Sequence, residues 1–443
     1  MVKLILNFLQ RNKLLKQGII DTNYYFLAQV GSRVIGLLII PVFARLLTVE
    51  EFALYDLFIL ASSLLVLLAG LGMDSGSAVM IAENRGNHQM LRSLLVTTLS
   101  INFATIGLLW LIGLMVWYFG FTEKFSLFFI HGLFTYTWFY QFSYQIYNFI
   151  RWLGNARNAA IVNFFSYLLA IGGGLFYILI GGATLTNYII GATGGSVIGA
   201  LLSAYQARKY LRCNFLKPQH FKDLMRLSLP YVPTYLSSYL MQFVDRLLIT
   251  TFFGLPTLGL YALINRVGQV VTFGLQTISS GFRPIITANY STDEGQSLSR
   301  KVFNIFWLLS IPVSAISILL APTIINLFGG VQYEMATSVL PFIILSVWFL
   351  GSFFLFGFGY QIRRKTIYVT LITLAVVALV YLLSIVLINF SGMVGIAQAT
   401  CISAVFGSWI YIFISEKLYR FQYSLRTMVI STFLSLIIVF LFS

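Results

Sequence analysis

Residues 52–72 read FALYDLFILASSLLVLLAGLG and contain one charged side chain, Asp56. A run of about 20 apolar residues is long enough to cross the hydrocarbon core of a bilayer as a helix. The whole chain has the same character, because 59% of its 443 residues are hydrophobic and only 9% are charged. A water-soluble domain carries roughly a quarter charged residues. The composition therefore predicts an all-α integral membrane protein without a sizeable soluble domain.

Twelve apolar runs, separated by charged or turn-rich breaks, predict twelve membrane-spanning helices. They cover residues 24–44, 52–72, 94–119, 125–150, 159–180, 188–207, 227–253, 258–282, 302–328, 336–360, 367–388 and 393–415. A thirteenth run, 428–442, is short for a span, so it is either an extra helix or a surface segment. Residues 1–20 mix apolar and basic side chains, which predicts an interfacial amphipathic helix on the cytoplasmic side.

Basic residues are distributed unevenly between the two sides of these spans. With the N-terminus in the cytoplasm, the opposite-side loops hold only Arg45 and Lys124 of the 28 Lys and Arg residues. Cytoplasmic loops retain positive charge in this way, which explains the net charge of +15 without a nucleic-acid partner. The external loops are all short, which argues against an enzyme with an external catalytic domain.

An internal repeat relates the two halves of the chain. The segment ALYDL at 53–57 resembles GLYAL at 259–263, and the same offset carries the first six spans onto the next six. Six spans return the chain to its starting side, so the halves share one orientation. We expect a six-helix bundle at 21–207, a basic cytoplasmic linker at 208–226, a second bundle at 227–417 and a C-terminal segment at 418–443. Two such bundles facing a cleft are typical of alternating-access transporters; the alternative is a stable scaffold without transport.

Three arginines lie inside the predicted spans. Arg33 is near the middle of the first span, where an arginine costs about 2.5–3.5 kcal/mol on insertion scales. Arg246 and Arg266 lie at similar depths in the seventh and eighth spans. We take these three residues as candidate binding groups for an anionic substrate. The alternative for Arg33 is a structural ion pair.

Acidic residues in or near the spans are candidates for ion pairs or for ion coupling. Asp245 can neutralise Arg246 or Arg266, and an Asp245–Arg266 bridge between neighbouring helices is the structural alternative to substrate binding. Asp56 is close to the start of its span, which favours a cap or an anchor at the interface. Asp74 lies where the second span approaches the cytoplasm, so both a solvated role and a gating role are open.

Two further patterns concern packing and ligand binding. The stretch FTYTWFYQF at 134–142 can stack on sugar rings, or it can face lipid and neighbouring helices. Gly191, Gly195 and Gly199 recur every four residues opposite a glycine run at 172–174, which predicts close packing of the fifth and sixth spans. The sequence contains no metal-ligand cluster or nucleotide motif, so we expect neither a cofactor nor an enzymatic activity.

Several short signatures in the chain resemble one known family. They are IIPVFARLLTVEEFALY at 39–55, LSLP at 227–230, VDR at 244–246, GLY at 259–261 and FRP at 282–284. In order and spacing they resemble O-antigen and capsule-type flippases of the multidrug, oligosaccharidyl-lipid and polysaccharide exporter superfamily. The resemblance implies a fold like that of multidrug and toxin extrusion proteins. It also marks Asp245–Arg246 as a recurring family dipeptide.

The same resemblance implies a function and a setting. Such proteins move an undecaprenyl-diphosphate-linked glycan from the cytoplasmic to the periplasmic leaflet of the bacterial inner membrane. Membrane lipid and proteins of glycan polymerisation and chain-length control are the implied partners. A diphosphate needs cationic hosts, which the three arginines can supply through bidentate hydrogen bonds. Without a nucleotide motif, an ion gradient is the expected energy source.

Two other functions remain open from the sequence alone. A multidrug or cation exporter of the related extrusion type would need buried carboxylates, whereas the spans hold three arginines. A membrane glycosyltransferase or polysaccharide polymerase would need a long external loop, and none is predicted.

Overall fold

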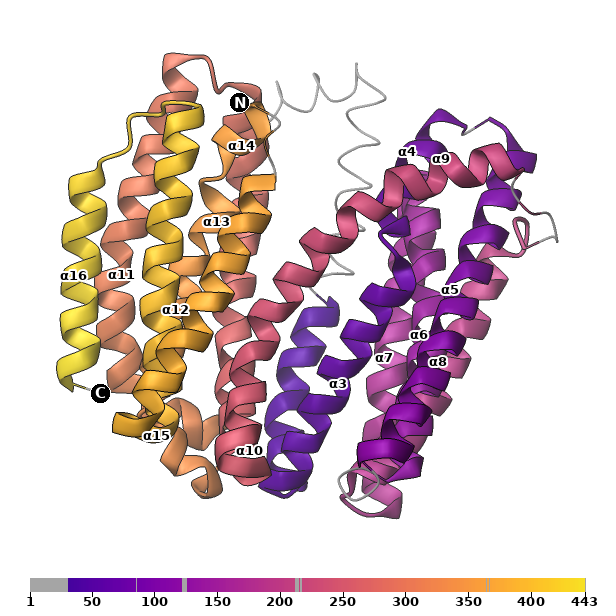
Figure 1. The fold of residues 1–443 in the computed structure, drawn as a ribbon, viewed down its shortest axis with the longest axis horizontal. Helices are drawn as coiled ribbons and strands as arrows, with labels where there is room; N and C mark the ends of the chain where they lie inside the picture. The colour runs from indigo at the N-terminus through magenta and orange to yellow at the C-terminus, as the bar shows by residue number, and fades with distance from the viewer. Residues whose placement is uncertain are drawn as a thin grey trace, which may run out of the picture. The chain divides into compact units, whose positions relative to one another are not determined.

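The computed structural model describes residues 31–84, 86–121, 126–211, 215, 217–363, 365 and 367–442. These residues form helices joined by turns, and they contain no strand (Figure 1). Nine helices of the described part are long and apolar enough to cross a membrane. The predicted all-α membrane architecture is therefore confirmed. The amphipathic helix expected at 1–20 and the start of the first span lie outside the described residues.

The helices of the first half follow the predicted spans closely. A helix at 31–46 is followed by α3 (Val49–Gly70), α4 (Met73–Glu83), α5 (His88–Val116), the π-helical turn η1 (Trp117–Phe121), α6 (Leu127–Trp152), α7 (Ala156–Gly181), α8 (Leu185–Ala207) and α9 (Pro218–Ser228). The second predicted span ends at Gly70, because Leu71 and Gly72 have positive φ angles of 47° and 72°. Left-handed backbone of this kind ends a helix, so α4 starts as a separate helix.

The second half contains two long helices, each divided by one glycine. Its elements are η2 (Leu229–Tyr231), α10 (Val232–Ala288), α11 (Asp293–Phe328), η3 (Val331–Ala336), α12 (Leu340–Leu350), α13 (Ser352–Leu355), α14 (Phe358–Ile362), α15 (Ile367–Leu418) and α16 (Leu425–Phe442). Gly254, with φ 80°, divides α10 into two helical arms, and Gly392, with φ 56°, divides α15. The two predicted loops at these positions are thus reduced to breaks at a glycine.

The chain forms two compact units. Unit 1 contains residues up to 39 together with 57–235, and unit 2 contains residues 40–56 together with 236–443. The division falls inside α3, between Asp56 and Leu57, and inside α10, between Tyr235 and Leu236. Residues 40–56, which the repeat places with the N-terminal bundle, therefore cluster with the second half of the chain.

Unit 1 is held together by close helix packing at glycines. A Cβ atom on Gly191 of α8 would collide with the carbonyl oxygen of Gly173 on α7. A Cβ atom on Gly195 would collide in the same way with the carbonyl oxygen of Leu169. The predicted tight packing of these two helices is confirmed. Elsewhere in unit 1, Gly76 of α4 lies against Ser228 at the end of α9.

Aromatic stacking and small polar contacts build the core of unit 2. The rings of Phe303 on α11 and Tyr423 before α16 stack with centroids 4.3 Å apart. Further along, α16 runs beside α11 (Figure 1), and the hydroxyls of Ser310 and Ser435 lie 2.8 Å apart. The run predicted at 428–442 thus belongs to an 18-residue helix that is apolar and long enough to cross a membrane.

Candidate functional site

Three ionised side chains meet inside unit 2. Asp56 lies in the second turn of α3, whereas Arg246 and Arg266 come from the two arms of α10. The Nε atom of Arg246 donates to Oδ2 of Asp56 at 2.8 Å, and Nη2 of Arg266 lies 2.9 Å from Oδ1. The side chain of Asp56 is 2% exposed, that of Arg246 is 6% exposed and that of Arg266 is 15% exposed. We call Asp56, Arg246 and Arg266 the charge triad.

The charge triad contains two guanidinium groups and one carboxylate. In a low-dielectric interior each buried charge needs a partner, and a single carboxylate offers one oxygen to each arginine. Arg246 also donates from Nη1 to the carbonyl oxygen of Gln242, and the guanidinium of Arg266 lies 5.7 Å from the ring centroid of Tyr55. The three side chains of the triad together carry a net charge of +1.

The charge triad explains why residues 40–56 cluster with unit 2. The start of α3 is fixed there by Asp56 and by the contact of Val49 with Gly259, where a Cβ atom would collide with the Val49 carbonyl oxygen. The aromatic rings of Phe52 and Tyr333 add an edge-to-face contact with centroids 6.0 Å apart. Residues 53–56 of the first repeat segment thus lie in the same compact unit as the second segment, 259–263.

Asp245 occupies a different environment from its neighbour Arg246. Its Oδ2 atom accepts from the hydroxyl of Tyr261 at 2.8 Å, and Oδ1 accepts from Thr400 of α15 at 3.2 Å. The alternative of a bridge from Asp245 to Arg266 is not what the described residues form, because Arg266 pairs with Asp56. Successive residues of a helix point about 100° apart, so Asp245 and Arg246 face different neighbours.

The position of Asp56 also differs from the expectation of an interfacial cap or anchor. The carboxylate is buried and paired with two arginines of α10. The sequence does indicate that the arginines within the spans have an acidic partner, because a buried guanidinium group needs an acid at the same depth. That signal does not say which acid pairs with which arginine.

The other two candidates lie in unit 1. Arg33 is an exposed residue of the helix at 31–46, and it belongs to a different compact unit from the charge triad. Asp74 lies in the first turn of α4, where its Oδ2 atom accepts from the hydroxyl of Tyr235 at 3.4 Å. The same hydroxyl lies 2.6 Å from that of Ser75. The structure therefore brings together Asp56, Arg246 and Arg266 among the six candidates.

Residues 20–288 match the model of the family described as polysaccharide biosynthesis protein. The chain belongs to this family. The match includes α3 and α10, and with them the charge triad of this polysaccharide biosynthesis protein. Comparison with individually curated proteins gives no match.

Solved structures with a similar fold include transporters of two kinds. One is an inward-facing multidrug resistance MATE family transporter of the MOP superfamily, with a TM-score of 0.71, 15% identity, and coverage of 91% of this chain and 98% of that chain. Another is the lipid II flippase MurJ in an inward closed conformation, with a TM-score of 0.67, 17% identity, and coverage of 94% and 91%. The MATE transporter VcmN of Vibrio cholerae has a TM-score of 0.62 at 14% identity, with coverage of 91% and 97%. The expected MATE-like fold is therefore confirmed.

Proposed function

We propose that this protein moves an undecaprenyl-diphosphate-linked oligosaccharide, such as an O-antigen or capsule repeat unit, from the cytoplasmic to the periplasmic leaflet of a bacterial inner membrane. Membership of a polysaccharide biosynthesis family supports a glycan substrate. Similarity to the fold of a lipid II flippase supports a lipid-linked one. In this topology the N-terminus is cytoplasmic, as the distribution of basic residues predicts.

The observation that carries the proposal is the composition of the charge triad. Arg246 and Arg266 share one carboxylate in a part of the protein where charges are costly. A diphosphate presents oxygens on two phosphoryl groups, so it can bind guanidinium groups through bidentate hydrogen bonds. Arg266, the more exposed of the two, is the residue that we expect to contact the diphosphate first. We include Arg33 as a third candidate residue for binding the diphosphate, because it is the remaining arginine within the predicted spans.

We further propose that the two halves of the chain, with residues 40–56 moving as part of the second half, are the moving bundles of an alternating-access cycle driven by an ion gradient. Asp74 and Asp245 are the candidate coupling groups, because each accepts hydrogen bonds from hydroxyl groups and neither forms an ion pair within the described part of the chain. Asp56 is less suited to this role, since it already pairs with two arginines.

A cation or multidrug exporter is the second candidate. It is favoured by the TM-score of 0.71 to a multidrug transporter. The charge triad argues against it, because a cationic substrate would meet two guanidinium groups and one carboxylate.

The experiment is a flipping assay in proteoliposomes with a fluorescent undecaprenyl-diphosphate oligosaccharide. We expect the native protein to flip it, and Arg266→Ala and Arg33→Ala to reduce the rate at least about tenfold, the loss expected for a charged hydrogen bond. Lys301→Ala, which removes an exposed cation of α11, is the matched control and should leave the rate unchanged. Native protein that moves no lipid-linked glycan but expels ethidium would support the multidrug function instead.

A further inference from the structure

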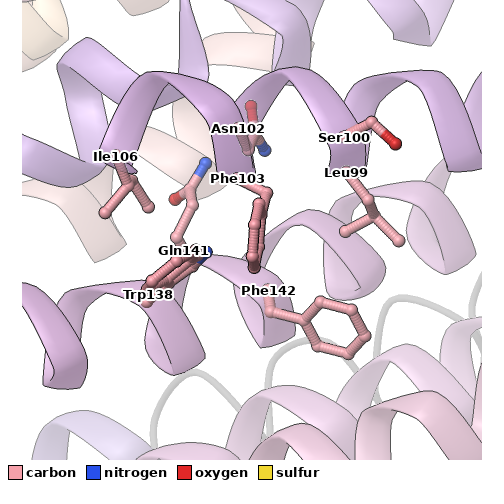
Figure 2. Close-up of a pocket in the computed structure, with 8 residues that line it drawn as sticks. All are labelled: Leu99, Ser100, Asn102, Phe103, Ile106, Trp138, Gln141 and Phe142. Atoms are coloured by element: carbon pink, nitrogen blue, oxygen red, sulfur yellow. The ribbon is translucent and has the colours of Figure 1, made fainter. Parts of the chain in front are cut away.

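A pocket in unit 1 lies between α5 and α6. Its volume is about 320 Å³, and Figure 2 shows the eight residues that line it. The stretch at 134–142, which the sequence left open between sugar stacking and packing, supplies Trp138, Gln141 and Phe142. Residues of α5, among them Asn102 and Phe103, form the opposite wall. About 300–1,000 Å³ is usual for a small-molecule site, so this pocket has room for one small ring.

Polar atoms in this pocket have no hydrogen-bond partner among the described residues. They are both amide atoms of Gln141, the amide oxygen of Asn102 and the indole nitrogen of Trp138. Both side chains are buried: Gln141 is 1% exposed and Asn102 is 3% exposed. In Figure 2 the side chain of Gln141 extends from α6 toward α5. Most buried polar groups are paired, so a cluster of unpaired atoms indicates an occupant that supplies the missing bonds.

The chemistry of the lining limits the occupant. The unpaired set comprises donors on Gln141 and Trp138 and acceptors on Gln141 and Asn102, so the occupant must both accept and donate hydrogen bonds. All eight lining residues are uncharged, which disfavours a phosphate or a cation. Lipid hydrocarbon chains cannot pair with an amide or an indole nitrogen, so they do not satisfy these atoms.

Aromatic rings form the remaining surface of the pocket. The rings of Phe103 and Trp138 lie with centroids 4.0 Å apart, and Phe142 lines the same cavity. Phe103 is 60% exposed, so its ring is at the mouth. Aromatic faces bind apolar, partly positive C–H groups, and a pyranose ring combines such a face with a rim of hydroxyl donors and acceptors.

We propose that the pocket between α5 and α6 is a binding subsite for one neutral sugar ring, with Gln141 and Asn102 binding hydroxyl groups and Trp138 stacking on the ring. The sugar is one residue of the transported glycan, and this identification of the source rests on the proposed function. Under the proposed function, the charge triad binds the diphosphate and the pocket binds a sugar ring of the same substrate. The two sites thus recognise chemically different parts of one molecule.

The test uses the purified full-length protein and a panel of methyl glycosides of common hexoses, 6-deoxyhexoses and N-acetylhexosamines. Saturation-transfer NMR measures their binding, with an uncharged cyclic ether as the apolar comparison. We expect at least one glycoside to bind saturably and the ether not to bind. Gln141→Leu should weaken that glycoside at least about tenfold, because it removes both amide atoms. Trp110→Phe is the matched control, because the ring of Trp110 lies 5.9 Å from that of Trp138 but does not line the pocket. The affinity of this variant for the glycoside should stay within about twofold of the native value.

Thermal unfolding separates a loss of the site from a loss of the fold. Without sugar, Gln141→Leu should be as stable as the native protein or more stable, because it replaces unpaired polar atoms with a side chain of similar size. If this variant does not fold, Trp138→Phe takes its place in the test, because it keeps a ring and removes the indole nitrogen. Its affinity for the glycoside should likewise fall at least about tenfold.

The proposal is overturned if no glycoside binds saturably, if the folded variant binds as tightly as the native protein, or if only ordered water fills the pocket. The binding assay needs no transport, so a native protein that binds glycosides but flips nothing would contradict the proposed function and leave the subsite intact.

Discussion

The Nε atom of Arg246 donates to the Oδ2 atom of Asp56 at 2.8 Å, although 190 residues separate them in the sequence. The other oxygen of the same carboxylate binds Arg266. One acid of α3 therefore pairs with arginines from both arms of α10, and we expect the stability of unit 2 to depend on it.

Asp56→Asn should destabilise the protein strongly. The change keeps the size of the side chain but leaves two buried guanidinium groups without a counter-charge, which costs about 3–5 kcal/mol. Thermal unfolding in detergent measures the loss. Glu50→Gln, an exposed acid in the first turn of the same helix, is the control and should change stability by less than about 0.5 kcal/mol. Equal midpoints for the two variants would show that the triad does not stabilise the fold.

The same substitution should increase affinity for an anion. If a diphosphate competes with Asp56 for Arg246 and Arg266, then Asp56→Asn removes the competitor, and inorganic pyrophosphate should bind about tenfold more tightly. Pyrophosphate should also raise the unfolding midpoint of the variant more than that of the native protein, because it binds the folded state. Calorimetric titration measures the first effect, and Arg266→Leu in the Asp56→Asn background should remove it. An unchanged affinity would contradict competition at this site.

Tyr261→Phe tests the environment of Asp245. The hydroxyl of Tyr261 donates to the buried carboxylate at 2.8 Å, and loss of a hydrogen bond to a charged group costs about 1.5–3 kcal/mol. Chemical unfolding should report this loss. Tyr333→Phe is the matched control, because the hydroxyl of Tyr333 is buried and has no hydrogen-bond partner in the described part of the chain. Its removal should leave stability unchanged or slightly higher, so a similar loss in both variants would point to ring packing instead.

Gly191→Ala tests the contact between α7 and α8. The added methyl group would meet the carbonyl oxygen of Gly173, so the helices must separate, at a cost of about 1–3 kcal/mol. Gly194→Ala, three residues further along α8, adds the same methyl group where no atom lies within 4 Å. Unfolding midpoints should fall for the first variant and not for the second. A fall for both would contradict the explanation by close approach, because Gly194 has open space for a methyl group.

Gly254→Ala tests the break within α10. Its φ of 80° and ψ of −173° are accessible to glycine and costly for other residues. The nearest side-chain atom leaves room for a methyl group, yet we expect the substitution to lower the free energy of unfolding by about 1–3 kcal/mol because of the backbone conformation. Gly274→Ala in the same helix has helical backbone and open space, and should raise stability by up to about 1 kcal/mol. The opposite signs distinguish backbone strain from crowding in an unfolding experiment.

The extent to which sequence predicted this structure differs between its elements. Hydropathy and length locate the helices because crossing a membrane requires about 20 apolar residues in succession. The glycines of α7 and α8 were also predictable, since spacing along one helix reveals the face that packs closely. The single-glycine breaks in α10 and α15 were harder to predict, because a short polar gap does not distinguish a loop from a sharp turn at one residue.

Pairing between distant residues was the part that sequence reasoning missed. The distance of Asp56 to the start of its span favoured a cap or an anchor at the interface, and a bridge from Asp245 to Arg266 was one of two alternatives. Depth along a helix leaves the direction of each side chain open, and a rotation of 100° between Asp245 and Arg246 sends them to different partners. The pocket at Gln141 was missed for the same reason, because its opposite wall comes from α5.

The separation of the charge triad along the chain has a consequence for biosynthesis. Asp56 leaves the ribosome 190 residues before Arg246, and at about 5–20 residues per second this interval lasts roughly 10–40 s. During that time α3 is complete, yet its carboxylate lacks both guanidinium partners. The nascent protein must therefore keep Asp56 hydrated, protonated or shielded by the insertion machinery until both arms of α10 have been made. Assembly of unit 2 is in this sense a late event, although its first contributing helix is among the earliest to be synthesised.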